Sequence, residues 1–123
     1  MYIDDLSIAD DVVLWRRIYA NTSWLHRDAD RPTSFAFRTQ RDDQLSMYVA
    51  TETTPERLLA GYDNCRIAQL IVGFLRSIDY GVVRDPVNGD NSHVLVFPRT
   101  ERLSGAAKKD ARLMAEAATW VQL

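Results

Sequence analysis

The segment from residue 80 to 98 constrains the fold most strongly, because two short apolar runs flank a turn. The runs are YGVVRD and SHVLVFP, both rich in valine and aromatic residues, and PVNGDN lies between them. Such side chains favour strands, whereas Asn88-Gly89 and the aspartates beside it favour a tight turn. The segment therefore predicts two antiparallel strands of a hairpin.

Two earlier segments alternate side chains with the period of a strand. In residues 12–18 a strand is favoured, with a helix from residue 8 to 19 left as the alternative. Residues 45–50, LSMYVA, are predicted as a strand with one face in the core. Residues 21–34 are polar and rich in turn formers, so we expect a loop that leads into a short extended piece, SFAFR, at residues 34–38.

A short helix is predicted after residue 53, because Thr54 can cap it, Pro55 suits its first position and Gly61 can end it. Residues 64–78 have two interpretations of equal weight. Their apolar spacing of three and four indicates one amphipathic helix. Alternatively, RIAQLI at residues 66–71 is a strand and VGFLRSI at residues 72–78 a short helix, since Gly73 weakens a longer helix.

An amphipathic C-terminal helix is also predicted, with its cap near Ser104. Its apolar stripe consists of Ala107, Ala111, Met114, Ala118 and Val121, with Leu113 and Trp120 beside it. The chain has 123 residues, 46% of them hydrophobic, and no linker-like tract divides it. We therefore expect residues 1–123 to form a single compact domain. The order of elements predicts an α+β fold, a small, mainly antiparallel sheet with the C-terminal helix packed on it.

Charge and apolar content argue against several classes of protein. Fifteen basic against seventeen acidic residues give a net charge of −2, which disfavours nucleic acid as the main ligand. The longest apolar run, LIVGFL, is far shorter than the about 20 residues of a membrane span. The start of the chain lacks the pattern of a secretory signal, and Cys65 is the sole cysteine. A cytoplasmic protein is expected.

His93 and Asp85 are the candidate catalytic residues, because a histidine beside a turn can act as a general base. The favoured alternative is that the His93 ring bonds Asp85 or the backbone across the turn and holds the hairpin together. The other histidine, His26, lies in a distant loop, so no metal site is expected. Serine-nucleophile and glycine-rich nucleotide motifs are missing. A role without catalysis and without a cofactor is therefore favoured.

Arg16 and Arg17, together with Arg31 and Arg38, are candidates for an anion site, because a guanidinium suits phosphates and carboxylates. The alternative is that these arginines are solvated or pair with the aspartates of the same region.

Three stretches of the chain resemble a family of short bacterial proteins of undefined activity. These stretches are LWRRI, RPTSFAF with LSMYVA, and GVVRDPVNGDNSHVLV. Members of that family have an Arg-Pro-Ser-Ser-like segment, a Leu-Ser-Val-like strand, and an Asp-Pro turn followed by Asn and His. The resemblance implies a shared fold and a common role for Asp85, Pro86 and His93, and it implies no particular reaction.

A looser similarity links LWRR, RPTSFAF and LSMYVATETTPERLLAG to ADP-ribosyltransferase-like toxins. Those enzymes bind NAD through an early Arg or His and a later Ser or Tyr, and use a glutamate near the last strands. In SHVLVFPRTE only Glu101 is available, beyond the strand. The resemblance implies a degenerate relative, either an enzyme or a nucleotide sensor.

Two functional hypotheses follow from these observations. The first is a protein-binding or adaptor module of a multi-component bacterial system, in which aromatic residues such as Trp24 and Phe35 contact another protein. The second is an enzyme or sensor for NAD or a related nucleotide. Its pocket would be formed by Arg16, Ser34, Ser46 and His93.

Overall fold

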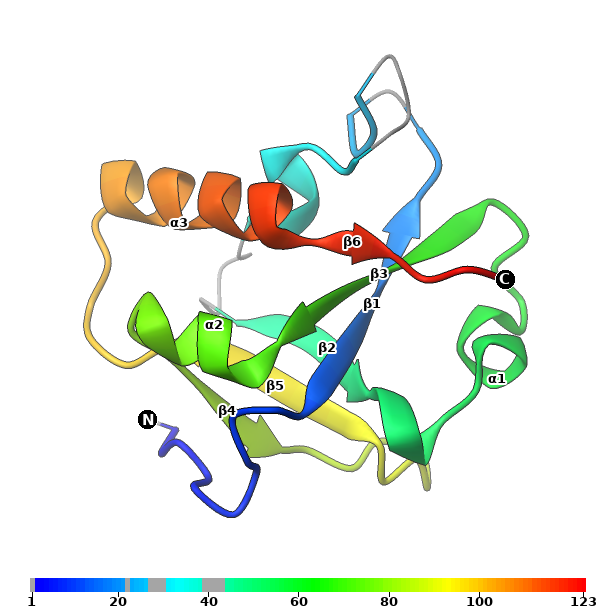
Figure 1. Cartoon of the computed structure of the whole chain (residues 1–123), viewed down its shortest axis with the longest axis horizontal. Coiled ribbons are helices and arrows are strands. Elements are labelled where there is room, and N and C mark those ends of the chain that lie inside the picture. The colour runs from blue at the N-terminus through cyan, green and yellow to red at the C-terminus, as the bar shows by residue number, and fades with distance from the viewer. Residues whose placement is uncertain (1, 22, 27–30, 39–43) are drawn as a thin grey trace.

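The computed structural model describes residues 2–21, 23–26, 31–38 and 44–123. Its elements in chain order are β1 (Val13–Tyr19), the 3-10 helix η1 (Ser34–Phe37), β2 (Leu45–Val49), the 3-10 helix η2 (Ala50–Glu52), α1 (Pro55–Leu59), β3 (Cys65–Ile71), α2 (Val72–Ser77), β4 (Tyr80–Arg84), β5 (His93–Pro98), α3 (Ser104–Ala117) and β6 (Thr119–Trp120). Figure 1 shows α3 crossing the molecule beside the sheet. The predicted α+β fold is confirmed.

The strands form one sheet in the order β4-β5-β2-β1-β3-β6, and every neighbouring pair is antiparallel. The sheet has two well-paired parts. In one, β1 pairs with β3 along its whole length. In the other, β5 lies between β2 and β4. Among the described residues, the pairing of β1 with β2 joins the two parts.

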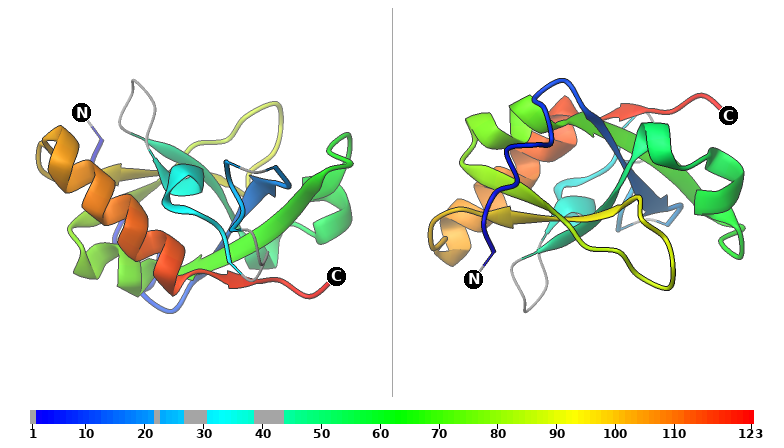
Figure 2. Two further views of the ribbon diagram at one scale, coloured as in Figure 1. Left: turned by 90° about the horizontal axis from the view of Figure 1, so that it is seen from above. Right: turned by 90° about the horizontal axis from the view of Figure 1, so that it is seen from below.

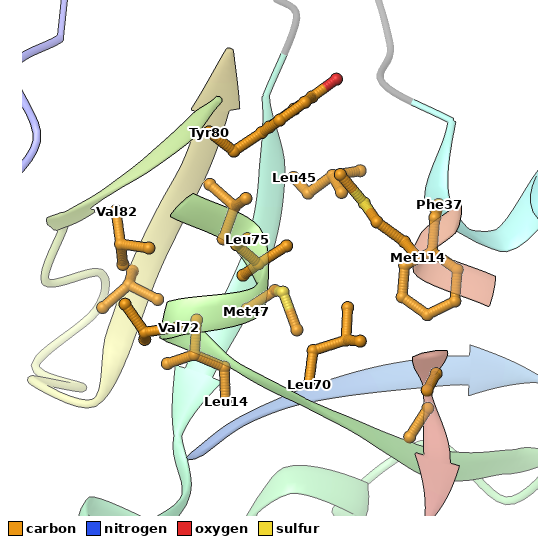
Figure 3. Packing of buried hydrophobic residues seen from close by; sticks show 14 of the residues in the cluster. Leu14, Phe37, Leu45, Met47, Leu70, Val72, Leu75, Tyr80, Val82 and Met114 are labelled. Atoms are coloured by element: carbon orange, nitrogen blue, oxygen red, sulfur yellow. The ribbon is translucent and has the colours of Figure 1, made fainter. Parts of the chain in front are cut away.

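The hydrophobic core lies between one side of the sheet and the helices α2, α3 and η1. Met114 of α3 lies close to Phe37 of η1, and Val72 and Leu75 of α2 cover the strands from the other end (Figure 3). The remaining labelled side chains come from the strands, and each is almost fully buried: Leu14, Leu45, Met47, Leu70, Tyr80 and Val82. Figure 2 shows α3 beside η1 on one face. This burial of apolar area is the main stabilising term.

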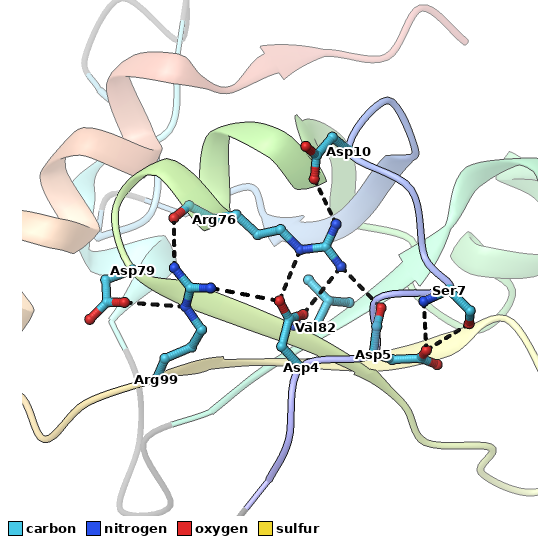
Figure 4. A network of polar contacts seen from close by, with 8 residues as sticks. All are labelled: Asp4, Asp5, Ser7, Asp10, Arg76, Asp79, Val82 and Arg99. Atoms are coloured by element: carbon cyan, nitrogen blue, oxygen red, sulfur yellow. Dashed lines mark hydrogen bonds and ion pairs between the residues drawn. The ribbon is translucent and has the colours of Figure 1, made fainter.

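The N-terminal segment is tied to the edge of β4 by a network of polar contacts (Figure 4). Arg76 of α2 forms an ion pair with Asp4 at 3.0 Å and with Asp10 at 2.7 Å. The Asp4 carboxylate also accepts a hydrogen bond from the backbone N–H of Val82. Asp4 therefore satisfies an edge N–H that would otherwise be open to another strand.

Most of the sequence-predicted elements are confirmed. The strand predicted at residues 12–18 is β1, which extends one residue further to Tyr19, and residues 45–50 contain β2. The segment from 80 to 98 forms the β4–β5 hairpin. The α1 helix follows Thr54, whose side chain accepts a hydrogen bond from the N–H of Arg57. Of the two interpretations of residues 64–78, the strand followed by a helix is correct, because β3 needs an extended backbone to pair with β1.

Three details of the sequence interpretation were wrong. Residues 34–37 form a 3-10 helix instead of an extended piece, which lets the consecutive Ala36 and Phe37 both enter the core. Ser104 is the first residue of α3 and gives no side-chain cap. The helix ends at Ala117, because the following residues leave it to pair with β3 as β6. Within the described ranges, no helix has the length and apolar character needed to cross a membrane.

Candidate functional site

The candidate site is a cleft of about 180 Å³ at the joint between β1 and β2. The two strands pair only at Leu14 with Val49 and at Trp15 with Tyr48 among the residues described. Beyond these pairs the strands diverge, as Figure 1 shows. The residues around the opening are Arg16, Arg17, Tyr19, Trp24, Ser46 and Tyr48.

Arg16 occupies the position where the next pair of the β1–β2 ladder would form. Its Nε donates to the carbonyl oxygen of Ala36 at 2.8 Å, and its Nη1 donates to that of Ser46 at 2.9 Å. The guanidinium also lies 5.5 Å from the centre of the Trp24 ring and 5.9 Å from that of Phe37. A side chain of β1 thus bonds a strand carbonyl of β2 where backbone pairing has ended.

Arg17 approaches the cleft from the other face of the sheet, because neighbouring residues of a strand point in opposite directions. Its Nη1 donates to the carbonyl oxygen of Leu58 at 3.0 Å, and its Nη2 donates to the hydroxyl of Tyr48 at 2.9 Å. The ring of Tyr62 lies 4.0 Å from its guanidinium carbon. These contacts hold Arg17 in one orientation at the cleft.

An aromatic pair forms one wall of the cleft. The rings of Tyr19 and Trp24 meet edge to face, with their centres 5.1 Å apart. The backbone of Trp24 is held on both sides, since its N–H donates to Asn21 and its carbonyl accepts from the N–H of Thr33. Tyr19 is 40% exposed, so this wall reaches the surface.

Among the described residues, the charges around the cleft are not balanced. None of the carboxylates in the described ranges forms an ion pair with Arg16 or Arg17, whereas Arg76, Arg84, Arg99 and Arg102 all do. Burial of Arg16, with a smaller contribution from the neighbouring positive charge of Arg17, lowers the pKa of Arg16 to about 10. An anion in the cleft would compensate this charge without first displacing a described carboxylate.

The two predicted catalytic candidates contact each other across the turn of the hairpin. The Nδ1 of His93 lies 2.7 Å from the carbonyl oxygen of Asp85 and 3.2 Å from its carboxylate. Because a carbonyl oxygen only accepts, Nδ1 is the donor in the shorter contact. The ring is buried and meets Tyr48 edge to face at 5.2 Å. The favoured prediction of a contact across the turn is therefore confirmed.

The cleft brings together part of the predicted binding residues. Arg16, Trp24 and Ser46 line it, but Ser34 and His93 are not among the lining residues. Phe35 lies on η1 and is 49% exposed, with the guanidinium of Arg38 at 5.3 Å from its ring. The four-residue pocket expected for a nucleotide is thus only half assembled.

Tyr19 and Tyr48 were not identified from the sequence as site residues. Tyr48 was interpreted as part of a regular strand, and Tyr19 fell just beyond the strand predicted for residues 12–18. Strand alternation alone places Arg16 and Arg17 on opposite faces. These side chains meet at one cleft because the β1–β2 ladder ends early, and where it ends depends on tertiary structure. In the described ranges no three His, Cys, Asp or Glu side chains are grouped so as to hold a metal ion.

Comparisons of the chain with models of protein families, with curated proteins and with solved structures found no match.

Proposed function

We propose that this protein is a binding module that receives an anionic group of a partner protein in the cleft between β1 and β2. The observation that carries the proposal is the Arg16 guanidinium, which lies at the cleft with no carboxylate partner among the described residues. An uncompensated, partly desolvated charge is costly, and an incoming anion relieves that cost.

The surroundings of the cleft support a protein partner. Tyr19 and Phe35 are exposed aromatic residues, and Trp24 lies in the cleft wall. Aromatic and arginine side chains are enriched at the centres of protein interfaces, where they supply much of the binding energy. Here an arginine and aromatic rings occur together at one opening.

The size of the cleft gives less support to the alternative of NAD or a related nucleotide. Sites for small molecules and cofactors usually have volumes of about 300–1,000 Å³. The cleft has about 180 Å³. At roughly 30 Å³ for each water molecule, this space corresponds to about six waters, enough for one anionic group and part of its carrier.

Affinity capture from the native host tests the proposal, with four forms of the tagged protein compared by quantitative mass spectrometry. The forms are the parent, Arg16→Gln, Tyr19→Glu and Tyr2→Glu. Tyr19→Glu brings a carboxylate to the mouth of the cleft. Tyr2→Glu is its matched control, because Tyr2 is similarly exposed at 45% and lies against Phe97, away from the cleft.

We expect one protein to be retained in stoichiometric amount by the parent and by Tyr2→Glu, and to be lost from the other two forms. Circular dichroism of each form establishes that it is folded. Tyr19→Glu keeps the test decisive if Arg16→Gln does not fold, since Tyr19 makes its contacts at the surface. Retention of the same protein by both cleft variants would overturn the proposal, as would recovery of a nucleotide without any protein.

A further inference from the structure

We propose that the group received by the cleft is a phosphate monoester carried on an aromatic ring, namely a phosphotyrosine side chain of the partner protein. This inference rests on the proposed function and deepens it by naming the ligand. Three independent properties of the cleft point to this group: its charge, its unused hydrogen-bond donors and its aromatic walls.

The charge of the cleft suits a dianion better than a carboxylate. Arg16 and Arg17 both line it, and no carboxylate among the described residues pairs with either. A phosphate monoester carries about −1.5 to −2 charges at neutral pH, whereas a glutamate or aspartate side chain carries one. The dianion can compensate both guanidinium groups, while a carboxylate leaves one positive charge uncompensated.

The two arginines also retain donors for an incoming ligand. Arg16 uses Nε and Nη1 for backbone carbonyls, and Arg17 uses Nη1 and Nη2 for Leu58 and Tyr48. The Nη2 of Arg16 and the Nε of Arg17 have no hydrogen-bond partner within the part of the chain that the structure describes. A phosphate has three oxygens that accept hydrogen bonds from such donors.

The aromatic walls distinguish a phosphate on a ring from other phosphates. Tyr19, Trp24 and Tyr48 line the cleft beside the two arginines. Tyr19 is 40% exposed at its mouth, and its ring meets that of Trp24 edge to face. A ligand ring that follows its phosphate into the cleft can pack against this pair, because aromatic pairs favour offset and edge-to-face contacts. A phosphoserine has no ring for that contact.

The experiment is a calorimetric titration of the full chain with capped pentapeptides that differ at one central residue. That residue is phosphotyrosine, tyrosine, glutamate or phosphoserine, and AMP and inorganic phosphate are titrated separately. The protein variants are Arg17→Gln and Tyr19→Leu, with Arg66→Gln as the matched control. Arg66 also lies over an aromatic ring, that of Trp120 at 3.7 Å, but is not part of the cleft.

We expect the phosphotyrosine peptide to bind at least about tenfold more tightly than each of the other probes, because one charge-assisted hydrogen bond accounts for about that factor. Arg17→Gln should weaken its binding by about the same factor, and Arg66→Gln should change it less than about twofold. Tyr19→Leu should weaken binding of the phosphotyrosine peptide and leave the affinity for inorganic phosphate unchanged.

Three outcomes would overturn the inference, and they distinguish it from the proposed function. If the glutamate and phosphotyrosine peptides bind equally well, and both depend on Arg17, the phosphotyrosine inference is wrong. The proposed function as an anion-binding module then still stands. Equal binding of AMP, inorganic phosphate and the phosphotyrosine peptide would identify a site for free phosphates instead. Absence of binding by every anionic probe, in a protein that circular dichroism shows to be folded, would overturn both proposals.

Discussion

The Nη1 of Arg16 donates a hydrogen bond to the carbonyl oxygen of Ser46 at 2.9 Å, in the region where β1 and β2 no longer pair. Backbone carbonyls inside a sheet normally accept from the neighbouring strand. Here the Arg16 side chain, instead of a backbone N–H of β1, donates to the carbonyl oxygen of Ser46, and the two strands diverge at this point. The same guanidinium then becomes the charged element of the cleft, so one residue links the break in the sheet to the candidate site.

The Arg16 guanidinium is expected to lose its proton with a midpoint at pH of about 10, well below the ordinary pKa of an arginine. NMR of its guanidinium carbon measures this directly, and saturating phosphotyrosine peptide should raise the midpoint, because the anion favours the charged form. Since the unfolded chain holds this proton more tightly, the free energy of unfolding contributed by Arg16 should rise as pH rises through about 10. A midpoint at the ordinary value would contradict the burial of this charge.

His93→Ala should lower the free energy of unfolding by about 1–3 kcal/mol, because the buried contact with the carbonyl oxygen of Asp85 is lost. Urea unfolding followed by tryptophan fluorescence measures the change. Asp85→Asn is the matched control and should cost less than about 1 kcal/mol, since the backbone carbonyl remains. His93→Asn can keep a donor near the position of Nδ1, so it should be less destabilising than His93→Ala. Equal stability of the parent and His93→Ala would show that the contact does not stabilise the hairpin.

Asp110→Ala should be among the most destabilising single changes in α3. Its buried carboxylate accepts from the hydroxyl of Tyr80 at 3.0 Å and from two nitrogens of Arg102 at 2.8 Å. Removal leaves the guanidinium without this partner, at a cost of about 3 kcal/mol. Tyr80→Phe removes the hydrogen bond to Asp110 and should cost about 1 kcal/mol. Thermal unfolding of both variants measures these changes, and Glu116→Ala, at an exposed position, is the control. Equal melting temperatures for all three variants would contradict the expected order.

Gly81→Ala and Gly105→Ala should change stability in opposite directions. A Cβ at Gly81 would lie 2.7 Å from a ring carbon of Phe97 and 3.0 Å from the Cβ of Asp4. Accommodating it must shift that ring and the N-terminal segment, at a cost of about 1–3 kcal/mol. A Cβ at Gly105 meets nothing within 4 Å, so alanine should stabilise α3 by up to about 1 kcal/mol. Differential scanning calorimetry checks both signs, and a destabilised Gly105→Ala would contradict the second.

The candidate site was predicted only in part. Arg16 and Arg17 were candidates for an anion site because of their side-chain chemistry, and Trp24 and Ser46 were named as binding residues. Nothing in the linear pattern indicated that Tyr19 and Tyr48 would join them. Conversely, Ser34 and His93 were grouped with Arg16 by residue type alone, and neither of them lines the cleft.

The sequence by itself determined the elements that depend on interactions between residues close together in the chain. The cap of Thr54 with Pro55, the turn at Asn88-Gly89 and the alternation in LSMYVA each act over a few residues, and each is present in the fold. Only tertiary structure decided between helix and strand for residues 64–78, because pairing with β1 supplies hydrogen bonds that periodicity does not encode. It also decided where β1 and β2 part, since a side chain of one strand bonds the backbone of another there. The cleft is a product of that long-range contact.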